Sequence, residues 1–213
     1  MEKYKAENNI NLADQDIIME KPSNNSAKNY LISKDDNSNI AKNTTRKVVL
    51  IGMLSATLTV GKLALSFIPN VEIITILIMV YATVFGRKIA VFSSLVFCTI
   101  EVLLYGFNSW VILYFIHWNA LALLSGTLLK KPRIIVAVLL SVIMTFAFGV
   151  LDSIIYTVMA AAGGVPNYQL LNLFIAYYLR GGWFYLVHIV SNACVVGALY
   201  IPLVLALQKV RPK

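Results

Sequence analysis

The sequence predicts an all-α membrane protein, a bundle of about six transmembrane helices with both termini in the cytoplasm. Three observations predict this fold class. Of the 213 residues, 59% are hydrophobic and only 13% are charged, which is more apolar surface than a soluble domain of this size can bury. From about residue 46 onward, long apolar runs alternate with short breaks, and Lys and Arg cluster in every second break. That alternation is typical of a multi-pass protein of the cell membrane.

The apolar part of the chain divides into six predicted spans, separated by breaks that contain turn residues. The spans cover residues 48–68, 71–86, 88–106, 109–129, 133–161 and 183–208. The second run is short for a full span, which favours little tilt or a partly re-entrant segment. The fifth run is long enough to tilt or to end in an extra turn.

Basic residues mark one side of these spans. They precede the first span and follow the second, fourth and sixth: Arg46, Lys47, Arg87, Lys88, Lys130, Lys131, Arg133, Lys209, Arg211 and Lys213. The breaks around 69–71 and 106–109 contain no base, and the connection 162–182 contains one, Arg180. By the positive-inside rule, an even number of spans with this alternation places both termini in the cytoplasm. Short basic clusters between apolar runs indicate contact with lipid head groups, so we expect no nucleic-acid partner.

A polar segment precedes the spans. Residues 1–45 contain six lysines and seven acids, whereas residues 46–213 contain twelve Lys or Arg and three acids. The polar segment is rich in Asn, Ser, Lys and Asp, and it cannot bury enough apolar surface to offset the entropy lost on ordering. The sequence therefore predicts a disordered cytosolic tail over 1–45 and a six-helix transmembrane domain over 46–213.

Six ionisable side chains lie within or at the edge of the predicted spans, all in the half nearer the outside. They are Lys62, Glu72, Glu101, His117, Asp152 and His188. A charged group at mid-membrane costs about 2.5–3.5 kcal/mol on insertion scales, so such groups need partners or a wet cavity. Lys62 pairs with Glu72 or Glu101 for structure alone, or it contacts a ligand; the sequence leaves both roles open.

Aromatic residues with polar tips gather in the same half. They are Tyr105, Trp110, Tyr114, Trp118, Tyr177, Tyr178, Trp183 and Tyr185. An interfacial aromatic belt also explains them, but a belt should occur at both membrane faces, and the cytoplasmic ends carry almost no Trp or Tyr. We therefore predict an aromatic-lined polar pocket that opens outward and suits a planar or heterocyclic solute.

The first span also carries small residues at a helical spacing. Gly52 and Ala56 lie four residues apart and share one face. Small residues at this spacing allow two helices to approach closely, either within this protein or against a partner.

Several catalytic signatures are missing from the sequence. It contains no GxxxxGK[ST], HExxH or GxSxG motif, so we expect no nucleotide hydrolysis by this chain, no resident metal and no cofactor. Two alternatives stay open. One is a stand-alone small-solute permease, and the other is a membrane-embedded enzyme that uses Glu101, His117, Asp152 and His188 for acid–base or metal chemistry.

Four pieces of the sequence share their order and spacing with a known family. They are Phe67-Ile-Pro-Asn-Val-Glu72 before an apolar run ending at Gly86; Glu101-Val-Leu-Leu-Tyr-Gly-Phe107 with Trp110; the Tyr114–Trp118 segment; and Arg180-Gly-Gly-Trp-Phe-Tyr-Leu-Val-His188 with Asn192. Over about residues 46–213 the chain resembles the substrate-binding S components of energy-coupling factor (ECF) vitamin transporters.

The resemblance implies a six-helix binding protein for a vitamin or related micronutrient, not an enzyme. It also implies two kinds of partner, a membrane coupling (T) subunit and two ATPase subunits, with the face of Gly52 and Ala56 docking on the coupling subunit. The solute would bind from outside, and the first loop would close over it. The whole subunit would then topple in the membrane when the ATPases act. The implied substrate-binding residues are Lys62, Glu72, Glu101, Trp110, Tyr114, His117, Trp118, Asp152, Trp183, Tyr185, His188 and Asn192.

Overall fold

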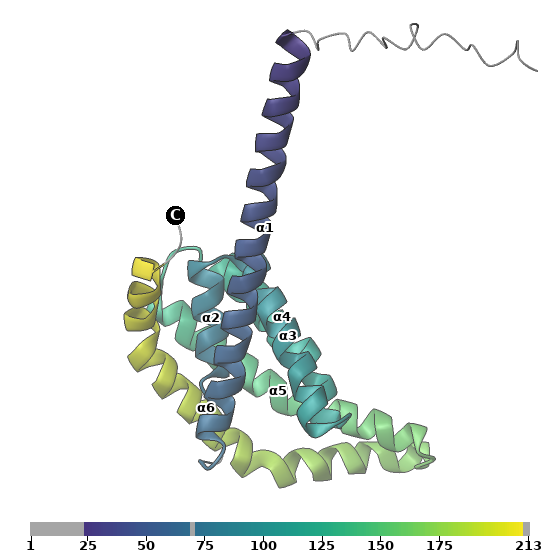
Figure 1. Cartoon of the computed structure of the whole chain (residues 1–213). Coiled ribbons are helices and arrows are strands. Elements are labelled where there is room, and N and C mark those ends of the chain that lie inside the picture. Colours follow the sequence, from purple (N-terminus) through teal and green to yellow (C-terminus); the bar gives the residue numbers. More distant parts are fainter. Residues whose placement is uncertain (1–23, 69–70, 211–213) are drawn as a thin grey trace, which may run out of the picture. The chain divides into compact units, whose positions relative to one another are not determined.

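The protein is a bundle of α-helices. The computed structural model describes residues 24–68 and 71–210, and this part of the chain contains six helices and no strand. The helices are α1 (Asn24–Leu65), α2 (Ile74–Val84), α3 (Arg87–Tyr105), α4 (Ser109–Leu128), α5 (Ile134–Ala162) and α6 (Asn167–Val210) (Figure 1). The chain divides into two compact units, Met1–Thr45 and Arg46–Lys213.

The described part of the first unit is helical. Residues 24–45 form the N-terminal part of α1, where the sequence predicts a disordered tail, and the rest of that prediction, over residues 1–23, lies outside the described residues. The physical reason for the difference is that α1 continues into the first apolar run. Adding residues to an existing helix avoids the cost of nucleation, so even a segment of modest helix propensity can extend it.

Within the described residues, five helices are long and apolar enough to cross a membrane. They are Lys42–Leu65 within α1, and α3, α4, α5 and α6. The predicted all-α membrane bundle is therefore confirmed. The remaining helix, α2, has 11 residues, about 16 Å at 1.5 Å per residue, so the helix by itself is shorter than a hydrocarbon core of about 30 Å.

The short helix α2 lies in the core of the bundle. Ten of its 11 residues are buried, and it contacts α3, α4, α5 and α6. A helix that is apolar on every side suits a position surrounded by other helices. This position carries the segment that precedes α2, including Glu72, into the bundle.

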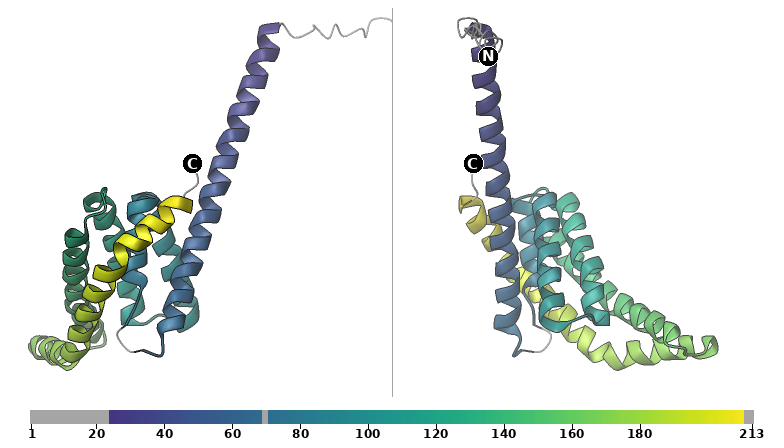
Figure 2. Two further views of the ribbon diagram at one scale, coloured as in Figure 1. Left: turned by 90° about the vertical axis from the view of Figure 1, so that its left-hand side faces the viewer. Right: turned by 45° about the vertical axis from the view of Figure 1, so that its right-hand side comes forward.

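The helix ends alternate between the two ends of the bundle. Figure 2 shows the α2–α3 and α4–α5 links and the end of α6 at one end, and the α1–α2, α3–α4 and α5–α6 links at the other. The basic residues flank the first of these ends: Arg87, Lys88, Lys130, Lys131, Arg133 and Lys209. The alternation that the sequence predicts is therefore present in the fold, and its cytoplasmic assignment stays a prediction.

Neutral polar groups join the helices in the half near the basic end. The Ser94 hydroxyl of α3 donates to the Asn119 side-chain oxygen of α4 at 2.7 Å, and the hydroxyls of Thr83 and Tyr200 lie 2.8 Å apart. Such bonds hold helices together where apolar burial gives little driving force.

Helix α6 begins earlier than the predicted sixth span. It runs unbroken from Asn167 to Val210, so the connection after α5 is limited to residues 163–166. The beginning of α6 packs along the end of α5, where the rings of Tyr156 and Tyr177 stack with centroids 4.0 Å apart. The end of α5 and the beginning of α6 form a helical arm that extends from the bundle, and the rest of α6 curves from this arm to the other end of the bundle (Figure 1).

Candidate functional site

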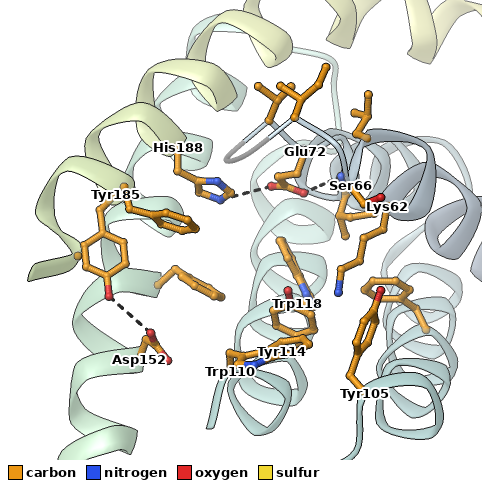
Figure 3. A pocket seen from close by; sticks show the side chains of 18 of the residues that line it. Lys62, Ser66, Glu72, Tyr105, Trp110, Tyr114, Trp118, Asp152, Tyr185 and His188 are labelled. Carbon is orange, nitrogen blue, oxygen red and sulfur yellow. Dashed lines mark hydrogen bonds and ion pairs between the residues drawn. The ribbon is translucent and has the colours of Figure 1, made fainter. Parts of the chain in front are cut away.

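A pocket of about 750 Å³ lies in the half of the bundle away from the basic helix ends. Figure 3 shows the side chains that line it. Its wall comes from the end of α1, the link before α2, the end of α3, the first half of α4, the second half of α5 and the middle of α6. Eight of the twelve predicted binding residues line it: Lys62, Glu72, Trp110, Tyr114, Trp118, Asp152, Tyr185 and His188. A volume of this size holds a small organic molecule.

Lys62 is fixed by a carboxylate and by three rings. Its ammonium group forms an ion pair with Glu101, which is completely buried. The Nζ atom also lies 4.9, 5.0 and 4.7 Å from the ring centroids of Tyr105, Trp110 and Tyr114. Ring faces attract a cation, and the cation neutralises the buried acid. Of the two possible partners of Lys62, the structure therefore selects Glu101, and Lys62 still forms part of the pocket wall.

Glu72 caps the N-terminus of α2. Its Oε2 atom accepts the backbone N–H groups of Ile74 at 2.7 Å and of Thr75 at 3.1 Å, a favourable position for a negative charge. From α6, Asn192 donates its side-chain amide to Glu72 Oε1 at 3.1 Å, and His188 Nε2 lies 3.8 Å from the same oxygen. Glu72 thus ties the α1–α2 link to α6, and its charge is well supported.

Asp152 occupies the opposite side of the pocket from Lys62 (Figure 3). It is 8% exposed. Its Oδ2 atom accepts hydrogen bonds from the hydroxyls of Tyr177 at 3.3 Å and Tyr185 at 3.5 Å. Its Oδ1 atom has no hydrogen-bond partner among the described residues.

Two glycines hold Tyr185 in this position. A Cβ atom added to Gly149 of α5 would lie 2.9 Å from the Tyr185 ring, and one added to Gly181 of α6 would lie 2.6 Å from it. Both distances are shorter than real carbon contacts, so the ring fits because both residues lack a side chain. The resulting slot directs the Tyr185 hydroxyl toward Asp152.

Aromatic side chains form the wall between these polar groups. Trp110, Tyr114 and Trp118 follow one face of α4, with ring centroids 5.4 and 5.6 Å apart. Across from them, the Phe148 ring of α5 lies 6.2 Å from that of Tyr114 and 6.3 Å from that of His188. All five of these side chains line the pocket, so their rings offer a surface to a flat ligand.

Four predicted binding residues do not line the pocket. Glu101 lies behind Lys62, and Asn192 is buried where it holds Glu72. His117 is 2% exposed and packs edge-on against Trp118, with centroids 4.6 Å apart, so it supports the wall. Trp183 is 76% exposed and is not part of this site. It precedes Tyr185 by two residues, and two helical steps of about 100° place the two side chains on opposite faces of α6.

Other residues line the pocket although they are not among the twelve implied binding residues. Tyr105 and Tyr177 belong to the aromatic set from which the sequence predicts the pocket, whereas the sequence analysis gives no pocket role to Ser66, Phe148, Arg180 and Phe184. Phe148 precedes Asp152 by one helical turn, a spacing that could have indicated it. Arg180 is the one basic residue of the predicted connection 162–182, which could have indicated it. Its exposed side chain lines the pocket.

The small-residue pair of α1 is free of internal packing. Gly52 and Ala56 are both exposed, and a Cβ atom added to Gly52 would meet no atom within 4 Å. The structure therefore does not use this pair to bring its own helices together. Lipid or a partner is left to cover that face.

No group of three or more His, Cys, Asp or Glu side chains within 24–68 and 71–210 is arranged to hold a metal ion. The four polar residues considered for metal chemistry are thus not gathered into one site. Comparisons with protein-family models, with curated proteins and with solved structures found no match for this chain.

Proposed function

We propose that this chain is the membrane-embedded binding subunit for a vitamin or related micronutrient, and that it delivers the solute to an ATP-driven importer of the ECF type. The pocket of about 750 Å³ carries the proposal, because its aromatic walls and few fixed polar groups suit a flat organic solute. Its position in one half of a membrane bundle gives access from one side of the membrane.

The chemistry of the pocket supports binding over catalysis. Lys62 is engaged by Glu101, and Glu72 is engaged by the N-terminus of α2. Such groups hold the wall in place and are poorly suited to exchange protons with a substrate. Of the ionisable groups in the wall, this leaves Asp152, His188 and the exposed Arg180 to contact a solute directly.

Two features support a partner-driven importer. The sequence has no phosphate-binding loop for ATP, so an ATP-driven importer built on this chain would obtain its ATPases from other chains. The exposed face around Gly52 and Ala56 offers a close-approach surface for a membrane coupling subunit. The proposed partners are thus a coupling (T) subunit and two ATPase subunits.

Affinity purification of the tagged full chain from native membranes in mild detergent tests the proposal. We expect mass spectrometry to identify one membrane coupling subunit and two ATPases with the wild type. Gly52→Leu should lose these partners, while the control Thr99→Leu, which also adds bulk to an exposed position, should keep them. Recovery of the chain alone in several detergents, together with solute flux in liposomes that contain only this chain, would instead identify a stand-alone permease.

A further inference from the structure

The second unit contains three carboxylates, and two of them have their charge compensated. The Glu101 carboxylate is paired with Lys62. The Glu72 carboxylate receives two backbone N–H groups of α2, the Asn192 amide and the nearby His188 ring. Asp152 is the third.

Asp152 lacks a comparable partner. Its hydrogen bonds come from two neutral tyrosine hydroxyls, both on Oδ2, and Oδ1 receives none. Within the described residues, no Lys, Arg or His lies within ion-pair distance of it. Arg180 lines the same pocket but is exposed. A carboxylate that is 8% exposed within a membrane helix is costly unless a positive or hydrogen-bond-donating group faces it.

The surroundings of Asp152 define what could supply that group. The carboxylate lies one turn beyond Phe148 and faces the aromatic side chains of α4 across the pocket (Figure 3). Rotation about its Cβ–Cγ bond is soft, so either oxygen can turn toward the pocket. Trp118 Nε1 and His188 Nδ1 are buried in the same wall, and neither has a hydrogen-bond partner among the described residues.

We propose that Asp152 selects for a planar nitrogen heterocycle with an amidine-type edge, in which adjacent ring and exocyclic N–H groups donate to the Asp152 carboxylate. The ring lies along Phe148 and the aromatic face of α4. Such an edge matches the two oxygens of a carboxylate and, when protonated, supplies the missing positive charge. This inference rests on the proposed function of a solute-binding subunit and narrows its substrate class.

Binding of two matched probes to the purified full chain tests the inference. The probe 2-aminobenzimidazole carries the amidine-type edge on a flat ring system, and benzimidazole-2-carboxylate carries an anionic edge on the same rings. We expect isothermal titration in detergent to show saturable binding of the first probe and none of the second. Asp152→Asn keeps the shape of the side chain but removes its charge, and it should weaken binding of 2-aminobenzimidazole by about tenfold or more.

Further variants separate recognition from folding. Tyr177→Phe and Tyr185→Phe keep the rings but remove the hydroxyls that hold Asp152, so each should weaken binding by a few-fold. Lys88→Gln removes a charge outside the pocket and should leave binding unchanged. Gel-filtration profiles and thermal unfolding establish that each variant is folded.

Three results would overturn the inference: no binding of 2-aminobenzimidazole by folded wild type, unchanged binding by Asp152→Asn, or tighter binding of the carboxylate probe. None of these would affect recovery of the coupling subunit and ATPases, which tests the proposed function separately. Recovery of those partners without selective binding of the amidine-type probe would keep the importer and reject this substrate class.

Discussion

The Lys62–Glu101 ion pair joins α1 to α3 behind the aromatic wall. Glu101 is completely buried, so Lys62 is what neutralises it. Replacing Lys62 with Met leaves an unpaired buried carboxylate, which we expect to destabilise the protein by about 3–5 kcal/mol. Thermal unfolding in detergent measures the loss. The double variant Lys62→Met/Glu101→Gln removes both charges and should recover most of it; equal losses in the single and double variants would show that the unpaired charge is not the cause.

The glycine slot around Tyr185 makes a second prediction at the residue scale. Gly149→Ala places a methyl group 2.9 Å from the Tyr185 ring, so the ring has to move away from Asp152. We expect a loss of about 1–3 kcal/mol in stability, typical of overpacking, together with weaker binding of 2-aminobenzimidazole. Thermal unfolding and titration measure the two effects.

A matched glycine on α1 provides the control for this prediction. Gly52 is also helical, and a methyl group added there meets no atom within 4 Å. Gly52→Ala should therefore not destabilise the protein, and the higher helix propensity of alanine should raise its stability by up to about 1 kcal/mol. If both alanine variants behave alike, the close contact with Tyr185 is not what requires glycine at position 149.

The sequence predicts which side chains gather in one half of the bundle better than it predicts their contacts. Position along a span places Lys62 at the correct depth, because helical rise is fixed. The choice of Glu101 over Glu72 as its partner depends on how neighbouring helices are rotated, and no single span contains that information. Because the rotation of each helix is not visible in the sequence, the twelve predicted binding residues include the exposed Trp183 and omit the pocket-lining Phe148.

At the scale of helices, α2 shows what an apolar run leaves undecided. The sequence indicates that residues 71–86 are short for a span. A run that is apolar on every face fits both lipid contact and burial among helices. In the structure α2 is buried among helices, because it contacts α3, α4, α5 and α6.

The buried position of α2 makes a prediction at this scale. Ile78 of α2 is 0% exposed and Ile143 of α5 is 62% exposed. Ile78→Ala should destabilise the protein by about 2–5 kcal/mol because it leaves a cavity in the core. Ile143→Ala should change stability by about 0.5 kcal/mol or less, since lipid or detergent fills the space. Thermal unfolding of the two variants compares them, and similar losses would mean that α2 is not the core of the bundle.

At the scale of the whole chain, the placement of basic residues predicts the arrangement of the helices better than composition predicts the structure of residues 24–45. The alternation of basic breaks correctly predicts which links share one end of the bundle, because insertion responds to the summed Lys and Arg of each link. The composition of residues 24–45 predicts disorder, yet this segment is helical in the structure. Composition describes a segment in isolation and omits the helix that it extends.

The same charge placement predicts from which side the pocket is reached. If the basic end is cytoplasmic, the α5–α6 link faces outward together with the pocket. Alkaline phosphatase needs disulfides to be active, and these form outside the cytoplasm. We therefore expect activity when it is inserted after Gly164 and none when it is inserted after Lys131, with equal amounts of each fusion measured by immunoblot. Activity after Lys131 and none after Gly164 would mean that the pocket faces the cytoplasm. The chain could then not capture a solute from outside for import.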